Sequence, residues 1–270
     1  MRIFDFLNIL VLLTIFTGIV TFVDWILRRK NSASHDERKY SIFVEYARSF
    51  FPVFLIVMLI RAFIFQPYRV PTGSLEPTVM PGDLIFVTQF NYGLKIPLWD
   101  KSIINIGHPE RGQIALFRWP VNPKLTFVKR VIGVPGDHIS YNNKVFTING
   151  VEATQSFVGN FQEDLGNGQF RPVKRYLENL NGIKHYILVN PEVPATNFNH
   201  LVVPEGMFMM VGDNRDDSDD SRDWGFVSEQ SFVGRALFVW FNIQFSPFSI
   251  NWHRIGNKLF ATHTARDGMQ

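Results

Sequence analysis

The chain has 270 residues, which is long enough for one large domain or two small ones. It contains no cysteine, which excludes disulfides, thiolate metal sites and a cysteine nucleophile. The formal net charge is only +3 and the basic residues are dispersed apart from one cluster, so we expect no binding to nucleic acid. Hydrophobic residues make up 46% of the chain. The mean hydropathy of +0.01 is high for a soluble protein and favours a membrane-associated one.

Two long apolar runs begin the chain, at residues 6–23 and 50–65. The first is long enough to cross the hydrocarbon core of a bilayer, and the second contains a single charge, Arg61. No small-residue cleavage pattern follows the first run, so we interpret it as a retained anchor and not as a removable signal peptide. The segment between them, about residues 28–48, is rich in Lys and Arg, which predicts a cytoplasmic loop. Residues 1–66 are therefore expected to form two transmembrane helices that place the rest of the chain outside the cytoplasm.

The rest of the chain is predicted to be mainly β, an extracytoplasmic catalytic domain of coiled antiparallel sheets. Short runs rich in β-branched and aromatic residues predict strands at residues 84–87, 113–117, 125–134, 144–148, 186–189, 207–211 and 236–241. Turn signals such as Asn149-Gly150 separate these runs. We expect residues 67–139 and 205–250 to form the β core. Residues 140–204 are expected to be a polar insertion that is partly loop, and residues 251–270 a C-terminal tail.

A turn bounded by Pro and Gly follows the second apolar run, with the sequence VPTGSLEPT over residues 70–78. Ser74 lies after a glycine and between Pro71 and Pro77, so a bent backbone presents its hydroxyl. Such a segment by itself is ordinary loop chemistry. Ser74 becomes a candidate nucleophile only if another part of the chain supplies a base.

Lys129 lies inside the apolar strand predicted over residues 125–134. Strand alternation places Lys129 on the same face as Phe127 and Val131. If this is the core face, burial lowers the pKa of Lys129, and the neutral amine is a base that can activate a serine. If the face is exposed to solvent, Lys129 is an ordinary surface lysine.

Interleaved Asp and Arg residues occupy positions 211–225. This stretch does not fit a calcium-binding loop, because Arg or Ser falls where the EF-hand pattern needs an oxygen ligand, Gly or Glu. Arg222 can pair with a carboxylate and hold the loop in place, so that a serine hydroxyl is offered to a buried lysine. The seven histidines lack metal-ligand spacing, so we expect no metal site. A Ser-His-Asp triad stays open, although no GxSxG pattern surrounds Ser74.

These segments, taken in order, resemble a known family. Two predicted spans, then PTGSLEPTV with GDLIFVTQFNYG, then FVKRVIGVPGD and GDNRDDSDDSRDWGFV, are similar to the four ordered signature boxes of bacterial type I signal peptidase (leader peptidase). The resemblance runs from the anchors to about residue 227. It implies a serine endopeptidase that needs no cofactor and that removes signal peptides from exported preproteins. The expected location is the outer, periplasmic face of the bacterial cytoplasmic membrane.

The resemblance also implies a role for each matched residue. Ser74 is expected to be the nucleophile and Lys129 the general base of a Ser–Lys dyad. Ser218 is expected to orient the lysine, while Asp220 and Arg222 brace the loop around it.

The implied oxyanion hole consists of the Ser74 N–H and the Thr72 hydroxyl. The family commonly has Ser at the position of Thr72 and Met at the position of Leu75. Threonine keeps the hydroxyl but adds a methyl that stiffens χ1, and leucine keeps the apolar volume of methionine. The implied substrate pockets are shallow, apolar and suited to small side chains. From their nearness in sequence to the dyad, the predicted pocket residues are Phe65, Val70, Leu75, Ile85 and Phe127.

Two other functions stay open from the sequence. One is a specialised Ser–Lys processing peptidase with a narrow target, which inability to cleave generic preproteins would favour. The other is a non-enzymatic, membrane-tethered domain whose β edges capture extended peptides, which binding without turnover would favour. The expected partners are exported preproteins and the lipid bilayer, with no nucleic acid and no metal ion.

Overall fold

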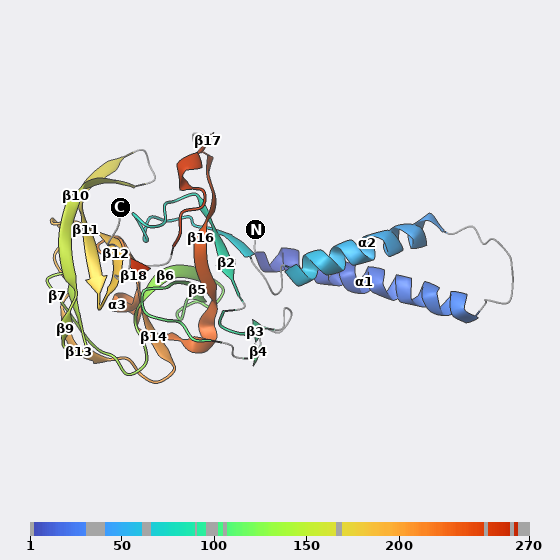
Figure 1. The fold of residues 1–270 in the computed structure, drawn as a ribbon, viewed down its shortest axis with the longest axis horizontal. Coiled ribbons are helices and arrows are strands. Elements are labelled where there is room, and N and C mark those ends of the chain that lie inside the picture. Colours follow the sequence, from blue (N-terminus) through green and yellow to red (C-terminus); the bar gives the residue numbers. More distant parts are fainter. Residues whose placement is uncertain are drawn as a thin grey trace. The chain divides into compact units, whose positions relative to one another are not determined.

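The computed structural model describes residues 3–30, 41–60, 66–89, 91–95, 102–104, 107–165, 169–245, 248–259 and 262–263. The chain divides into two compact units (Figure 1). The first contains residues 1–65 and 94–104, and the second contains residues 66–93 and 105–270.

The first unit contains helices α1 (Ile3–Lys30) and α2 (Ile42–Leu59) and the short paired strands β3 (Leu94–Lys95) and β4 (Ser102–Ile104). Both helices are long and apolar enough to cross a membrane, over Asn8–Arg29 and Ile42–Leu59, as the sequence predicts. The helices pack closely, since a Cβ on Gly18 would lie 2.9 Å from the ring of Phe51.

Helix α2 begins eight residues before the predicted second run. The reason is that hydropathy locates the apolar part of a helix, whereas Glu45, Ala47 and Arg48 are good helix formers that extend it. Residues 28–30 and 42–48 of the predicted loop therefore belong to the two helices.

The second unit is built of antiparallel sheets, which confirms the predicted mainly β fold. All seven predicted strands are present, with ends that differ by a few residues. The largest sheet has the order β1 (Gln66–Arg69), β2 (Asp83–Thr88), β16 (Phe232–Phe245), β5 (Ile114–Arg118), β6 (Thr126–Gly133), β14 (Met207–Val211) and β15 (Val227–Ser228), with β17 (Phe248–Ile250) paired to β16.

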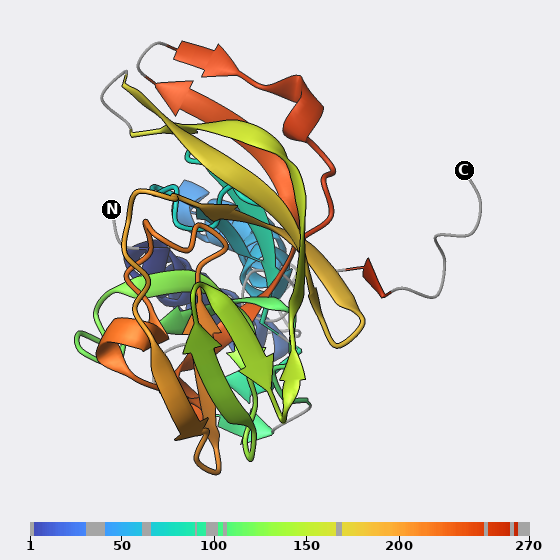
Figure 2. The same cartoon turned by 90° about the vertical axis from the view of Figure 1, so that its left-hand side faces the viewer.

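Two further sheets of the second unit have four strands each. One has the order β10 (Thr154–Asp164), β11 (Phe170–Leu180), β12 (Ile183–Val189) and β18 (Thr262–His263). The other has the order β13 (Phe198–Val202), β7 (His138–Asn142), β8 (Val145–Ile148) and β9 (Val151–Glu152). Figure 2 faces the long β10–β11 hairpin, drawn in yellow.

Residues 140–204, expected to be partly loop, are thus mostly strand. The strands are hard to see in the sequence because some of their buried positions hold charged or titratable side chains. Glu178 on β11 and His185 on β12 are examples, with 0% and 6% exposure. A hydropathy pattern does not mark such positions as buried, so it underestimates the strand content.

The turn between β1 and β2 is anchored in the apolar core. Leu75 and Val79 are buried with 1% and 0% exposure and share a cluster with Ile85 on β2, Val128 on β6 and Val239 on β16. The residue that directly follows Ser74 is therefore fixed in the interior while Ser74 stays half-buried.

Candidate active site

Ser74 lies in a compact turn between β1 and β2. The Glu76 N–H donates to the Gly73 carbonyl (2.9 Å) and the Val79 N–H to the Leu75 carbonyl (3.0 Å). The carbonyl of Ser74 itself accepts from the backbone N–H of Asn214 (3.1 Å). The serine is thus held both by its own turn and by the loop that follows β14.

Lys129 lies in the middle of β6, where it pairs with Ala115 of β5. Its side chain is buried, with 4% of the residue exposed, and its Nζ donates to the Ser218 Oγ (2.9 Å). Burial lowers the pKa of Lys129 from 10.5 to about 8, against the raising effect of the nearby Asp220 and Asp219 carboxylates. The amine is therefore much closer to its neutral form at neutral pH than a surface lysine is.

Ser218 links Lys129 to a buried carboxylate. The Ser218 Oγ donates its proton to Asp220 Oδ2 (2.7 Å), so the Oγ lone pairs are left to accept from Lys129. Asp220 Oδ2 also accepts from the Gly212 N–H (3.0 Å) and from Arg222 Nη2 (2.8 Å), and Oδ1 accepts from Arg222 Nε (2.8 Å). Burial raises the pKa of Asp220, but hydrogen bonds and charge from Arg222 outweigh it and hold the pKa below its ordinary value. The carboxylate is therefore ionised when Ser218 binds to it.

A single cleft of 580 Å³ brings the polar candidates together, lined by Thr72, Ser74, Lys129 and Ser218. Gly212 lies where Ser74 and Ser218 meet. A Cβ at Gly212 would come within 2.4 Å of the Ser74 carbonyl oxygen and 2.2 Å of the Ser218 Oγ. Only the absence of a side chain allows this approach.

The predicted pocket residues separate into three groups. Val70 and Phe127 line the cleft. Leu75 and Ile85 do not, since both are buried in the core with 1% and 0% exposure. Nearness in sequence does not decide on which face of a turn or strand a side chain lies. Phe65 lies outside the described residues.

Sequence reasoning also missed residues that line the cleft. Besides the prolines and backbone of the Ser74 turn, these include Tyr68, Thr126, Leu165, Asp217 and Asp219. Tyr68 and Thr126 belong to β1 and β6 and are close in sequence to Ser74 and Lys129, which makes them candidates but does not show that their side chains face the cleft. Leu165 directly follows β10, and nothing in the sequence relates it to the site.

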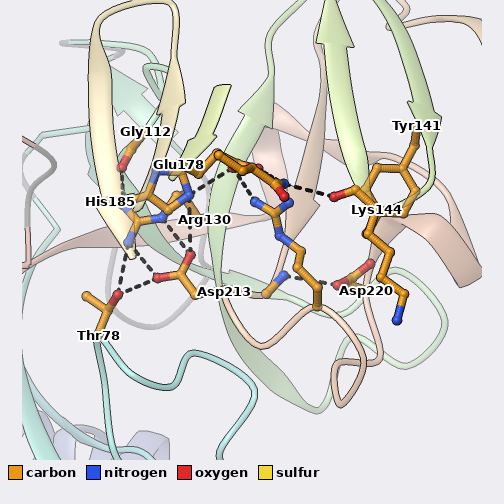
Figure 3. Close-up of polar contacts among 12 residues, drawn as sticks. Thr78, Gly112, Arg130, Tyr141, Lys144, Glu178, His185, Asp213 and Asp220 are labelled. Carbon is orange, nitrogen blue, oxygen red and sulfur yellow. Dashed lines mark hydrogen bonds and ion pairs between the residues drawn. The ribbon is translucent and has the colours of Figure 1, made fainter. Parts of the chain in front are cut away.

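An ion pair on the opposite face of β6 supports the same loop (Figure 3). Successive side chains of a strand lie on opposite faces, so Arg130 lies on the face opposite Lys129. It binds Asp213 through Nε–Oδ1 (2.7 Å) and Nη2–Oδ2 (2.6 Å), with both side chains 1% exposed. Its Nη1 donates to the Gly112 carbonyl (2.6 Å), and the Thr78 hydroxyl donates to Asp213 Oδ2 (2.6 Å). The residue before Asn214 is thereby tied to the turn that carries Ser74.

Comparison with known proteins finds a matching family and several similar proteins. A sequence profile of the family described as "Signal peptidase, peptidase S26" matches residues 43–241. A signal peptidase I of Pseudomonas fluorescens is 37% identical over 214 residues, which cover 75% of this chain and 74% of that protein. A signal peptidase I of Buchnera aphidicola is 32% identical, with 90% of this chain and 93% of that protein covered. A crystal structure of a signal peptidase I from Enterococcus faecalis matches 48% of this chain and 98% of its own, with 29% identity and a TM-score of 0.29.

Proposed function

The chain belongs to the signal peptidase family, peptidase S26, and from this membership we propose that it is a membrane-bound serine endopeptidase that removes N-terminal signal peptides from exported preproteins. In this proposal Ser74 is the nucleophile and Lys129 is the general base. One observation carries it: a buried lysine, bonded to Ser218, lines the same cleft as a serine in a well-anchored turn.

The first half of the reaction is acylation. Neutral Lys129 takes the proton from the Ser74 Oγ, which attacks the scissile carbonyl carbon. The Ser74 N–H and the Thr72 hydroxyl stabilise the negative charge that develops on the carbonyl oxygen. Neither group forms a hydrogen bond with another residue of the described part of the chain, which leaves both for the substrate. Lys129 then gives its proton to the leaving amine as the peptide bond breaks.

The second half releases the signal peptide. Lys129, neutral again, takes a proton from a water molecule that attacks the acyl carbon bound to Ser74. The proton returns to the Ser74 Oγ as the ester bond breaks. Ser218 keeps the lysine amine in place in both halves, because its own hydroxyl proton is held by Asp220.

The proposed cleavage follows small side chains, at the residue before the cut and at the one two places further back. The apolar side chains of Val70 and Phe127 wall the cleft and support rejection of larger groups by volume. The proposed location is the bacterial cytoplasmic membrane, spanned by α1 and α2, with the catalytic unit on the periplasmic side. The Lys and Arg residues of the segment at 28–48 support this orientation. Anchoring raises the effective concentration of substrates held in the same bilayer.

The test is cleavage of a preprotein with alanine at the cut site by the full chain in detergent. Ser74→Ala and Lys129→Ala are each expected to abolish cleavage, and Lys129→Arg too, because arginine stays protonated. Lys124→Ala, an exposed lysine in the connection between β5 and β6, is the matched control and should cleave like the wild type.

Full activity of Lys129→Ala would end the dyad proposal. Cleavage of only a few of many preproteins by the wild type would point to a specialised processing peptidase. Binding of signal peptides by the wild type without turnover at any pH would point to a non-enzymatic peptide-binding domain.

A further inference from the structure

The far end of the β10–β11 hairpin reaches the active-site cleft. Glu163, near the end of β10, is 1% exposed, and Leu165 lines the cleft. Arg171, near the start of β11, donates through Nε to Glu163 Oε2 (2.7 Å). Arg171 Nη2 also lies 3.6 Å from Asp217 Oδ2, and Asp217 is a further residue of the cleft wall. The hairpin therefore contributes to the surroundings of Ser74.

The second carboxylate oxygen of Glu163 binds the loop that holds Ser74. Glu163 Oε1 accepts a short hydrogen bond from the side-chain amide of Asn214, which is 2% exposed. The same amide nitrogen donates to the Gly73 carbonyl (3.4 Å), and the backbone N–H of Asn214 donates to the Ser74 carbonyl (3.1 Å). A carboxylate and a carbonyl can only accept, so both partners require the NH₂ group of Asn214 on their side. Glu163 thus fixes which way the amide points.

The Asn214 amide gives the Gly73 carbonyl a second hydrogen bond, beside the one from the Glu76 N–H (2.9 Å), and so helps to set the direction of a catalytic N–H. The Gly73 carbonyl and the Ser74 N–H belong to one planar trans peptide, in which they point in opposite directions. Fixing the carbonyl oxygen therefore fixes the direction of the N–H. An oxyanion donor must be aimed before the reaction at the place where charge develops, and this pre-orientation accounts for its effect on the rate.

We propose that Glu163 is a positioning residue that acts through Asn214 to aim the Ser74 N–H at the oxyanion. The proposal rests on the proposed function, in which this N–H is an oxyanion donor. In this proposal the β10–β11 hairpin contributes to catalysis through Glu163, which contacts neither the substrate nor the reacting atoms.

Two substitutions of similar size separate the hydrogen bond from the charge. Glu163→Gln keeps an oxygen that accepts from Asn214 but loses the charge that pairs with Arg171. Arg171 is partly exposed and can pair with Asp217 instead. We therefore expect kcat to stay near that of the wild type. Glu163→Met removes the acceptor. Loss of a whole oxyanion donor lowers kcat by about 10²–10³-fold, and loss of its support should lower kcat by about tenfold with KM little changed. Gln162→Ala, the exposed neighbour on β10, is the control and should behave as the wild type.

An unchanged kcat in Glu163→Met would overturn the proposal, and so would equal losses in Glu163→Met and Glu163→Gln, which would assign the effect to the ion pair with Arg171. If the thermal transition shows that Glu163→Met does not fold, Asn214→Ala is measured in its place. This variant removes the amide through which Glu163 acts, so it should show the same fall in kcat. Wild-type kcat in Asn214→Ala would overturn the proposal. Failure of the proposed function is separate, since it would appear as a wild type whose cleavage does not depend on Ser74.

Discussion

Lys129 Nζ donates to the Ser218 Oγ over 2.9 Å, a contact between residues 89 positions apart in the sequence. The contact joins the middle of β6 to the loop between β14 and the short helix α3 (Ser221–Trp224). The amine is buried and its acceptor is oriented by Asp220, so the lysine has one defined position in the cleft.

The rate of preprotein cleavage should rise as the pH passes through about 8. Lys129 acts as a base only when it is neutral, and burial lowers its pKa from 10.5 to about 8. Below this pH the amine holds a proton and cannot take the one on Ser74; above it the base is available. The measurement is kcat/KM of the wild type against pH from about 6 to 10, a range that brackets this value. A profile that is flat or that falls over this range would contradict Lys129 as the base.

Ser218→Ala should lower kcat by about a hundredfold or more, within the range that a positioned base contributes. The substitution removes the oxygen that accepts from Lys129 and the hydroxyl that donates to Asp220, so the amine loses its fixed position. Ser221→Ala is the matched control in the same loop. Its hydroxyl accepts from the Met210 N–H (2.9 Å) instead, so this variant should lose stability but keep kcat. Equal kcat values for the two variants would show that Ser218 does not orient the base.

The local structure around Ser74 and Lys129 can be predicted from the sequence. The strand prediction over residues 125–134 matches β6, and alternation separates Lys129 from Arg130, which the structure places on opposite faces. The Ser74 turn was recognisable from its prolines and glycine. These features depend on local periodicity and turn chemistry, which a sequence expresses directly.

Other parts of the site are formed by contacts between distant segments, and no pattern in the sequence of either segment predicts such a contact. Glu163 and Asn214 are 51 positions apart, and nothing in either segment indicates the other. Both are buried polar groups that satisfy each other, as do Glu178 and Arg215, whose side chains are 0% exposed. A hydropathy pattern assigns such residues to the surface, so both the hairpin and its role at the cleft were missed.

Gly212→Ala should abolish cleavage. An added Cβ would lie 2.2 Å from the Ser218 Oγ and 2.4 Å from the Ser74 carbonyl oxygen, so the two residues must move apart. Gly150→Ala is a control of the opposite kind, because Gly150 has φ of +80° with no atom within 4 Å of the added Cβ. It should lose about 1 kcal/mol of stability from backbone strain and keep kcat. Measured kcat together with thermal unfolding separates the two cases, and normal cleavage by Gly212→Ala would mean that Ser74 and Ser218 need no close approach.

Thr72→Val should lower kcat by about 10²-fold with little change in KM, while Thr72→Ser should cleave like the wild type. Valine keeps the shape of threonine and removes only the hydroxyl, which lines the cleft and is exposed. Serine keeps the hydroxyl and removes only the methyl. Steady-state kinetics of the two variants therefore separate hydrogen bonding to the oxyanion from the shape of the cleft wall. If valine cleaves normally, the Ser74 N–H is sufficient for the oxyanion. Glu163→Met should then lower kcat more than Thr72→Val does, because Glu163 helps to orient that N–H through Asn214.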